Sequence, residues 1–181
     1  MTDKHGAGKI QKGMIHMNNP KIKIYVRDFG TITAELYPDK APKTVENFLS
    51  LIKNGFFSGL IFHRVISGFM IQGGGYNESF GETDASPIKG EFAANGFAQN
   101  DLKHTRGVLS MARTNDPNSA SSQFFIMHKD APYLDRQYAG FGKVTEGIEV
   151  VDKIAAVQTG RMGWFDDVPK VPVVIDRMEI V

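Results

Sequence analysis

The chain has 181 residues and a formal net charge of +1, from 21 basic and 20 acidic side chains. This length is typical of one domain, and the near-neutral balance gives no electrostatic footprint for nucleic acid or for an anionic membrane surface. The absence of cysteine from the sequence excludes disulfides, thiolate metal sites and a cysteine nucleophile.

The segment MTDKHGAGKIQKGMIHMNNP, residues 1–20, is polar and rich in Gly, Lys and Asn. We predict that it forms a flexible extension followed by one domain over residues 21–181; a short docking arm is the alternative. The segment lacks the apolar core of a signal peptide, and no later run approaches the roughly eighteen apolar residues of a membrane span. We therefore expect cytoplasmic residence and no membrane contact.

The domain opens with two runs of alternating apolar and polar residues around a glycine-containing turn. The apolar positions are Ile22, Ile24 and Val26 before the turn, and Ile32, Ala34 and Leu36 after it. This alternation predicts a β-hairpin over residues 21–36.

A helix is predicted after the hairpin. Val45, Phe48, Leu49 and Ile52 lie at helical spacing, Pro42 suits the first turn, and Gly55 marks the end. A second helix is predicted over Gly147–Ala156 from apolar residues at the same spacing.

Six further β-like runs are Leu60–Val65, Phe69–Gln72, Gly107–Ala112, Gln123–Met127, Ala139–Val144 and Val173–Val181. Long connections rich in Gly, Asn and Ser separate several of them. Many short strands with only two helices favour a mainly β fold, either a closed barrel or a sandwich.

The usual catalytic patterns are missing. The five histidines form no pair at metal-ligand spacing, and a G-x-S-x-G nucleophile motif does not occur. The run Gly73-Gly74-Gly75 lacks the following residues of a phosphate loop, so we interpret it as a turn or a place of close backbone approach. We expect neither a metal nor a cofactor.

Two of the predicted strands each place an amide beside a large apolar side chain. Met70 and Gln72 share one face of the earlier strand, and Gln123 and Phe125 share one face of the later strand. Together these residues would line an apolar groove with a few oriented polar groups, as binding sites usually are.

Arg64 lies in an apolar run, FHRVISGFMIQGGG, that contains no acidic residue. Either its stem packs on the fold while its head group reaches water or carbonyl oxygens, or its guanidinium faces a ligand. A guanidinium stays protonated, so in the second case it acts only as a donor and a fixed cation. It would then assist reactions in which a lone pair or an anion develops.

Three blocks of the sequence resemble the cyclophilins, the peptidyl-prolyl cis/trans isomerases. They are F-H-R-V-I-x-G-F-M-I-Q-G-G at 62–74, S-x-x-S-Q-F-F-I at 119–126 and F-G-K-V at 141–144. The similarity extends from about Ile22 to the C-terminus. It implies a closed eight-stranded antiparallel β-barrel with a helix capping each end, and an active groove on the outside of the barrel.

The resemblance also implies the role of each site residue. Arg64 matches the catalytic arginine and Gln72 matches the glutamine that contacts the substrate backbone. The walls of the proline pocket match Phe69, Met70, Phe125 and Leu134. Ala112 and Arg113 match a segment whose backbone pairs with the peptide, and Gln123 also lines the groove.

Three positions depart from the best-known eukaryotic members. Tyr133 replaces a tryptophan that is part of the cyclosporin contact in those members, so we expect weakened cyclosporin binding with isomerisation retained. Tyr138 replaces a histidine and is expected to remain a substrate contact. Arg113 replaces a smaller polar residue, which favours acidic neighbours of the target proline. Such variants look like bacterial members.

The resemblance therefore predicts a monomeric prolyl isomerase that acts on proline-containing peptides and on folding proteins, without nucleic acid or membrane partners. The alternative is a module or chaperone that binds proline-containing segments, with incidental turnover. Arg64 separates the two, because a pure binder does not need a cation over the prolyl nitrogen.

Overall fold

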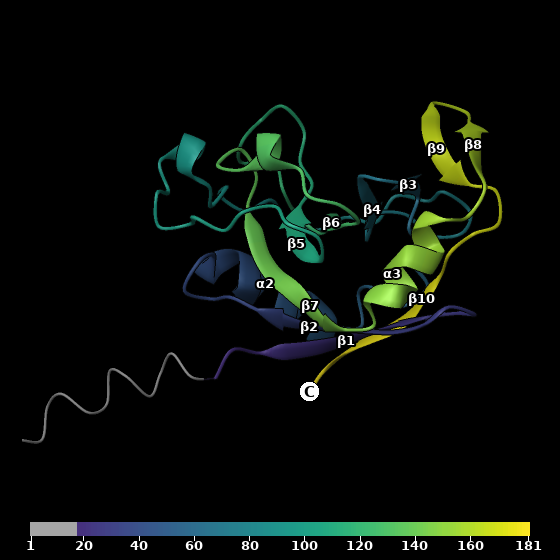
Figure 1. The fold of residues 1–181 in the computed structure, drawn as a ribbon, viewed down its shortest axis with the longest axis horizontal. Helices are drawn as coiled ribbons and strands as arrows, with labels where there is room; N and C mark the ends of the chain where they lie inside the picture. The colour runs from purple at the N-terminus through teal and green to yellow at the C-terminus, as the bar shows by residue number, and fades with distance from the viewer. Residues whose placement is uncertain (1–17) are drawn as a thin grey trace, which may run out of the picture.

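The computed structural model describes residues 18–181 and contains one eight-stranded antiparallel sheet (Figure 1). Its strands are β1 (Lys21–Val26), β2 (Gly30–Leu36), β3 (Arg64–Ile66), β4 (Met70–Gly73), β5 (Val108–Met111), β6 (Phe124–Met127), β7 (Gly140–Glu146) and β10 (Ile175–Ile180). The spatial order is β10-β1-β2-β7-β5-β6-β4-β3. The predicted hairpin is confirmed, with Lys21 opposite Glu35 and Val26 opposite Gly30.

The sheet is an open half-barrel, so the prediction of a closed barrel was wrong. In the described part of the chain, β10 and β3 are the two edges and no ladder joins them. The predicted strand over residues 60–65 is regular only from Arg64, and before that a single bridge pairs Ile61 with Val174. The segment ahead of β3 thus meets the chain leading into β10 through isolated hydrogen bonds, such as Phe62 N–H to Val173 O at 3.0 Å.

Both predicted helices are present. They are α2 (Pro42–Lys53), with Pro42 in its first turn, and α3 (Ile148–Ala155). Val45, Phe48 and Ile52 are the apolar residues that α2 buries, at the spacing expected for a helix that packs on a sheet. No helix in residues 18–181 has both the length and the hydrophobicity that a membrane crossing demands.

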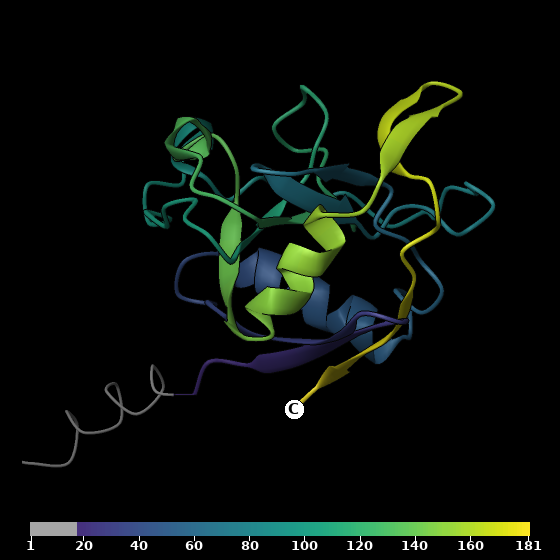
Figure 2. The same cartoon turned by 45° about the vertical axis from the view of Figure 1, so that its right-hand side comes forward.

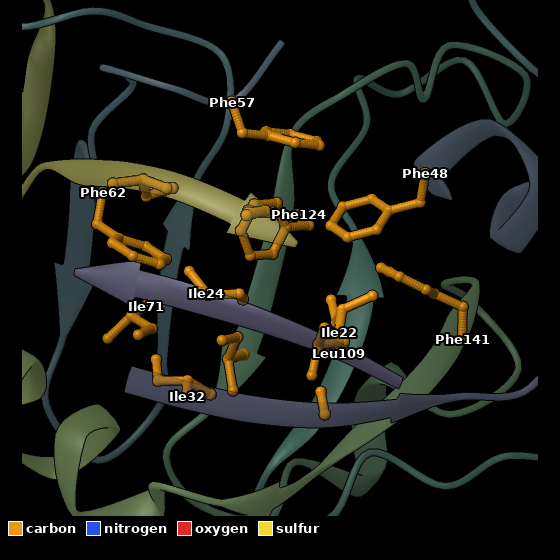
Figure 3. Close-up of a cluster of buried hydrophobic side chains, with 14 of the residues drawn as sticks. Ile22, Ile24, Ile32, Phe48, Phe57, Phe62, Ile71, Leu109, Phe124 and Phe141 are labelled. Atoms are coloured by element: carbon orange, nitrogen blue, oxygen red, sulfur yellow. The ribbon is translucent and has the colours of Figure 1, made fainter. Parts of the chain in front are cut away.

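Phenylalanine rings fill the interior between the sheet and α2 (Figure 3). Phe48 lies at the centre, with ring centroids 4.9 Å from Phe57, 5.3 Å from Phe124 and 5.0 Å from Phe141. Inclined contacts at these distances are favourable for aromatic pairs. This core supports the inner face of the sheet and leaves the outer face to carry a site.

Two features of the fold were not predicted. One is a separate two-stranded sheet of β8 (Thr159–Met162) and β9 (Phe165–Pro169), whose polar, glycine-containing sequence lacks clear alternation. The other is a pair of short 3-10 helices, η2 (Ala93–Asn95) and η3 (Pro132–Leu134).

The predicted extension over residues 1–20 lies mostly outside the described residues. Of its last three residues, two contact β2: Pro20 O accepts a hydrogen bond from Leu36 N–H at 2.8 Å, and Asn19 Nδ2 donates to Glu35 Oε1 at 2.9 Å. The described fold therefore begins ahead of β1.

Candidate active site

The outer face of β4, β5 and β6 carries a second apolar cluster, separate from the core. Its buried members are Met70, Val108, Phe125, Met127, Ala131 and Leu134, with Ile66, Phe69, Leu102, Ala112 and Tyr138 packed against them. Ile71, Phe124 and Ile126 belong instead to the core. Successive residues of β4 and β6 thus alternate between the two clusters, as the period of a strand requires.

Arg64 begins β3 and is exposed beside this cluster. It lies opposite Gln72 in the β3–β4 ladder, and its Nη1 donates to Gln72 Oε1 at 3.4 Å. Gln72 Nε2 in turn donates to Gln123 Oε1 at 3.1 Å. Among residues 18–181, Arg64 has no carboxylate within ion-pair distance. The guanidinium is therefore positioned by the Gln72 amide, and its charge stays available to a ligand.

The walls of the apolar slot come from β6, η3 and the turns around them. The ring of Phe125 meets that of Tyr138 edge-on, with 5.9 Å between the ring centroids. The ring centroids of Phe69 and Tyr133 lie 6.0 Å apart. Leu134 is buried in η3, whereas Tyr133 on the same turn is 69% exposed. The slot therefore has a fixed floor and one open aromatic wall.

A polar network of His104, Ser110 and Asp135 packs against the ring of Phe125. The sequence analysis did not predict it. His104 Nε2 lies 2.8 Å from Ser110 Oγ, and His104 Nδ1 lies 3.2 Å from Asp135 Oδ1. The imidazole stacks on Phe125 with centroids 6.1 Å apart. Burial lowers the pKa of His104, while Asp135 opposes that shift. Ser110 and His104 are buried, so this trio ties η3 to β5 rather than offering a nucleophile.

Arg113 closes one side of the slot. Its guanidinium lies 4.6 Å from the ring centre of Tyr138 and 4.9 Å from that of Phe92. Nη1 donates to Thr114 O at 2.9 Å and Nη2 donates to Gln137 O at 2.8 Å. The side chain therefore clamps Tyr138 in place, a role that its sequence position did not reveal.

A polar pocket of about 210 Å³ adjoins the slot. It is lined by Gln72, Glu82, Ala112, Arg113, Thr114, Ser119, Ser121 and Gln123. The N–H of Ala112 donates to Gln123 O at 3.0 Å, so the fold already uses that donor. Any pairing of a peptide with Ala112 must use the carbonyl oxygen.

The three glycines after β4 permit close packing behind this pocket. A Cβ on Gly75 would lie 2.5 Å from Gln123 Cγ, and one on Gly74, where φ is +90°, would lie 2.9 Å from Ser122 O. Real Cβ atoms do not approach so closely, which confirms the interpretation of the run as a place of close approach.

All eleven predicted site residues are brought together on this face. Side-chain hydrogen bonds link Arg64 to Gln72 and Gln72 to Gln123, and the other eight residues contribute to the slot or its rim. Within residues 18–181, no three His, Cys, Asp or Glu side chains are grouped to hold a metal ion.

A curved antiparallel sheet with an arginine, two amides and an apolar slot on its outer face defines a peptide-binding site of the cyclophilin type. Residues 21–180 match the family model described as "Cyclophilin type peptidyl-prolyl cis-trans isomerase/CLD". The chain therefore belongs to the cyclophilin-type peptidyl-prolyl cis-trans isomerases, a family of enzymes.

Bacterial relatives are similar over most of the chain. A peptidyl-prolyl cis-trans isomerase of Acinetobacter baylyi is 50% identical over 159 residues, covering 84% of this chain and 81% of that protein. Peptidyl-prolyl cis-trans isomerase B of Escherichia coli is 45% identical over 160 residues, covering 83% and 94%.

Solved structures agree with the sequence relatives. A cyclophilin-type isomerase of Cryptosporidium parvum has a TM-score of 0.75 and 28% identity, covering 91% of this chain and 98% of its own. A structure of the same enzyme in the presence of the dipeptide Ala-Pro has a TM-score of 0.73 and 29% identity, covering 89% and 98%.

Proposed function

We propose that the chain accelerates cis–trans rotation about X-Pro bonds in peptides and folding proteins, with Arg64 as the catalytic residue. The observation that supports this most directly is the position of Arg64, exposed at the edge of the slot and bonded to the Gln72 amide. Family membership makes prolyl peptides the expected substrate class.

The chemistry needs no nucleophile. A peptide bond resists rotation by about 18–20 kcal/mol because the nitrogen lone pair is delocalised into the carbonyl. In the twisted transition state, that lone pair localises on the prolyl nitrogen. A guanidinium aimed at the nitrogen gains a hydrogen bond that the planar ground state barely offers, and only such differential binding raises the rate. Each ~1.4 kcal/mol gained in this way is worth tenfold.

The surrounding residues hold the substrate while it twists. The apolar slot between Met70, Phe125 and Leu134 suits a proline ring and excludes water from it. Gln72 and Gln123 place amide groups next to Arg64, where they can bond the peptide backbone on one side of the rotating bond. One side of the bond is thus anchored and the other is free to turn.

The decisive experiment compares wild type with Arg64→Ala in an NMR exchange assay on an X-Pro peptide. We expect a loss of rate of about a hundredfold or more, or roughly 3 kcal/mol of transition-state stabilisation, with peptide affinity mostly kept. Arg177→Ala is the matched control, because it removes an exposed arginine that pairs with Glu179 on β10, outside the slot. Arg177→Ala should retain full activity.

Two outcomes would contradict the proposal. If wild type binds the peptide but shows no exchange, only the role of a proline-binding module or chaperone remains. If Arg64→Ala exchanges the peptide as fast as wild type, catalysis does not depend on the guanidinium.

Three finer points extend the proposal. The open wall at Tyr133 supports weakened cyclosporin binding, since a tyrosine takes the place of the tryptophan that other members use. A monomeric state and cytoplasmic residence stay predictions from the sequence.

A further inference from the structure

The β8–β9 hairpin projects from the body of the molecule, as both views show (Figures 1 and 2). Its turn carries two exposed apolar side chains: Trp164 is 94% exposed and Met162 is 52% exposed. Trp164 is also the only tryptophan in the 181-residue sequence. Tryptophan and methionine are enriched at protein interfaces, and an isolated tryptophan at a tip adds nothing to the stability of the core.

The end of the hairpin next to the turn is anchored by aromatic contacts of Phe165, the first residue of β9. Phe165 lies 5.1 Å from Tyr76, 5.5 Å from Phe80 and 6.1 Å from His63, measured between ring centroids. Phe80 adopts a φ of +60°, a left-handed conformation that bulky residues rarely take. An isolated two-stranded hairpin is marginally stable in water, so this packing is what holds the tip in place.

A hollow of about 260 Å³ opens between the tip and residues 79–80 of the loop after β4. It is lined by Ser79, Phe80, Met162, Gly163, Trp164 and Phe165. Its walls are mainly apolar and its size suits one side chain. The tip therefore carries a shallow, mainly apolar hollow.

The hollow lies on the side of β3 away from the apolar slot. The sheet order places β6, β4 and β3 in sequence, and β9 packs next to β3, where Phe165 meets His63, the neighbour of Arg64. β4 and β3 are paired strands about 4.8 Å apart. β9 belongs to the separate sheet and packs on β3 with Cα atoms within 8 Å, so the path from β4 across β3 to β9 is roughly 13 Å. An extended peptide covers that distance in about four residues.

We propose that the hairpin tip is a second contact for the peptide substrate. In this arrangement Trp164, Met162 and Phe80 receive one apolar side chain of the substrate, about three to five residues from the isomerised proline. The inference rests on the proposed function, because the substrate must first cross Arg64. It predicts that the enzyme favours long, partly apolar segments such as unfolded chains over short peptides.

The first test uses the fluorescence of Trp164, which reports on the tip alone when tyrosine is not excited. Three probes are titrated: a blocked X-Pro tetrapeptide, the same core lengthened on either side by about six residues containing leucines, and a version with serines in place of the leucines. We expect the leucine peptide to shift the emission to shorter wavelength and to protect it from iodide. The tetrapeptide and the serine peptide should leave the emission unchanged.

The second test compares the Trp164→Ala variant with wild type in the isomerisation of the same three peptides. We expect KM for the leucine peptide to rise about tenfold, with kcat/KM for the tetrapeptide within about twofold of wild type. Val171→Ala is the matched control, because Val171 is also an exposed apolar residue, at 78%, and lies outside the hollow. It should behave as wild type with all three peptides.

Each result decides the inference. An unchanged emission at leucine-peptide concentrations that saturate isomerisation would overturn it, as would equal losses by Trp164→Ala on long and short peptides. If no peptide is isomerised but the leucine peptide still shifts the emission, the proposed function fails while the contact at the tip stands.

Discussion

Replacing Arg113 tests whether this residue clamps the groove or attracts acidic substrates. In the structure its guanidinium donates to the carbonyls of Thr114 and Gln137 and lies between the rings of Tyr138 and Phe92. These contacts occupy both terminal nitrogens. The clamp thus competes with the sequence-based expectation that Arg113 selects acidic neighbours of proline.

The contacts give the size of the effect in Arg113→Ala. Hydrogen bonds from a charged donor contribute about 1.5–3 kcal/mol each, and we take about 2 kcal/mol for the two bonds together because the side chain is only partly buried. The two ring contacts add about 1 kcal/mol. A total of about 3 kcal/mol lowers Tm by roughly 6–12 °C in a chain of this length.

The kinetic consequence follows from the loosened Tyr138 wall. We expect KM for a prolyl peptide to rise about fivefold, a loss of roughly 1 kcal/mol of binding, while kcat changes less. Thermal unfolding and NMR exchange measure the two effects on the same samples.

Arg113→Lys separates the two roles, because lysine keeps the charge but loses the planar fork that bridges two carbonyls and stacks on rings. The clamp predicts that Arg113→Lys resembles Arg113→Ala in both stability and KM. If the lysine variant is as stable as wild type and prefers acidic peptides equally well, the clamp is refuted.

Two further predictions concern acid stability and the open aromatic wall. Burial, assisted by the charge of Arg64, lowers the pKa of His63 to about 4 from 6.5, so the folded state prefers the neutral ring. Stability is therefore complete above about pH 6.5 and falls by about 3 kcal/mol as the pH drops towards 4, since each pKa unit corresponds to about 1.4 kcal/mol. Urea unfolding at pH 7 and pH 4.5 measures the loss, and an equal loss in His63→Phe would show that another group causes it. Tyr133→Trp should strengthen cyclosporin binding in a calorimetric titration without altering isomerisation; nanomolar affinity of the wild type would contradict the weakened contact.

The local sequence determined which residues face the groove. The alternation in β4 and β6 assigned Met70 and Phe125 to the faces that line a groove, and the structure places both in the outer cluster, with Ile71 and Phe124 in the core. The reason is geometric, because successive side chains of a strand point to opposite faces whatever the remainder of the chain does. The family motifs predicted the role of Arg64, which periodicity alone left open.

Only the tertiary structure decided how distant segments meet. The contact of His104 with Asp135 joins residues 31 positions apart, and the clamp joins Arg113 to the carbonyl of Gln137 across 24 positions. The open edge between β3 and β10 likewise depends on how the chain around Ile61 meets Val174. Such contacts arise from packing between segments, and local periodicity carries no information about them.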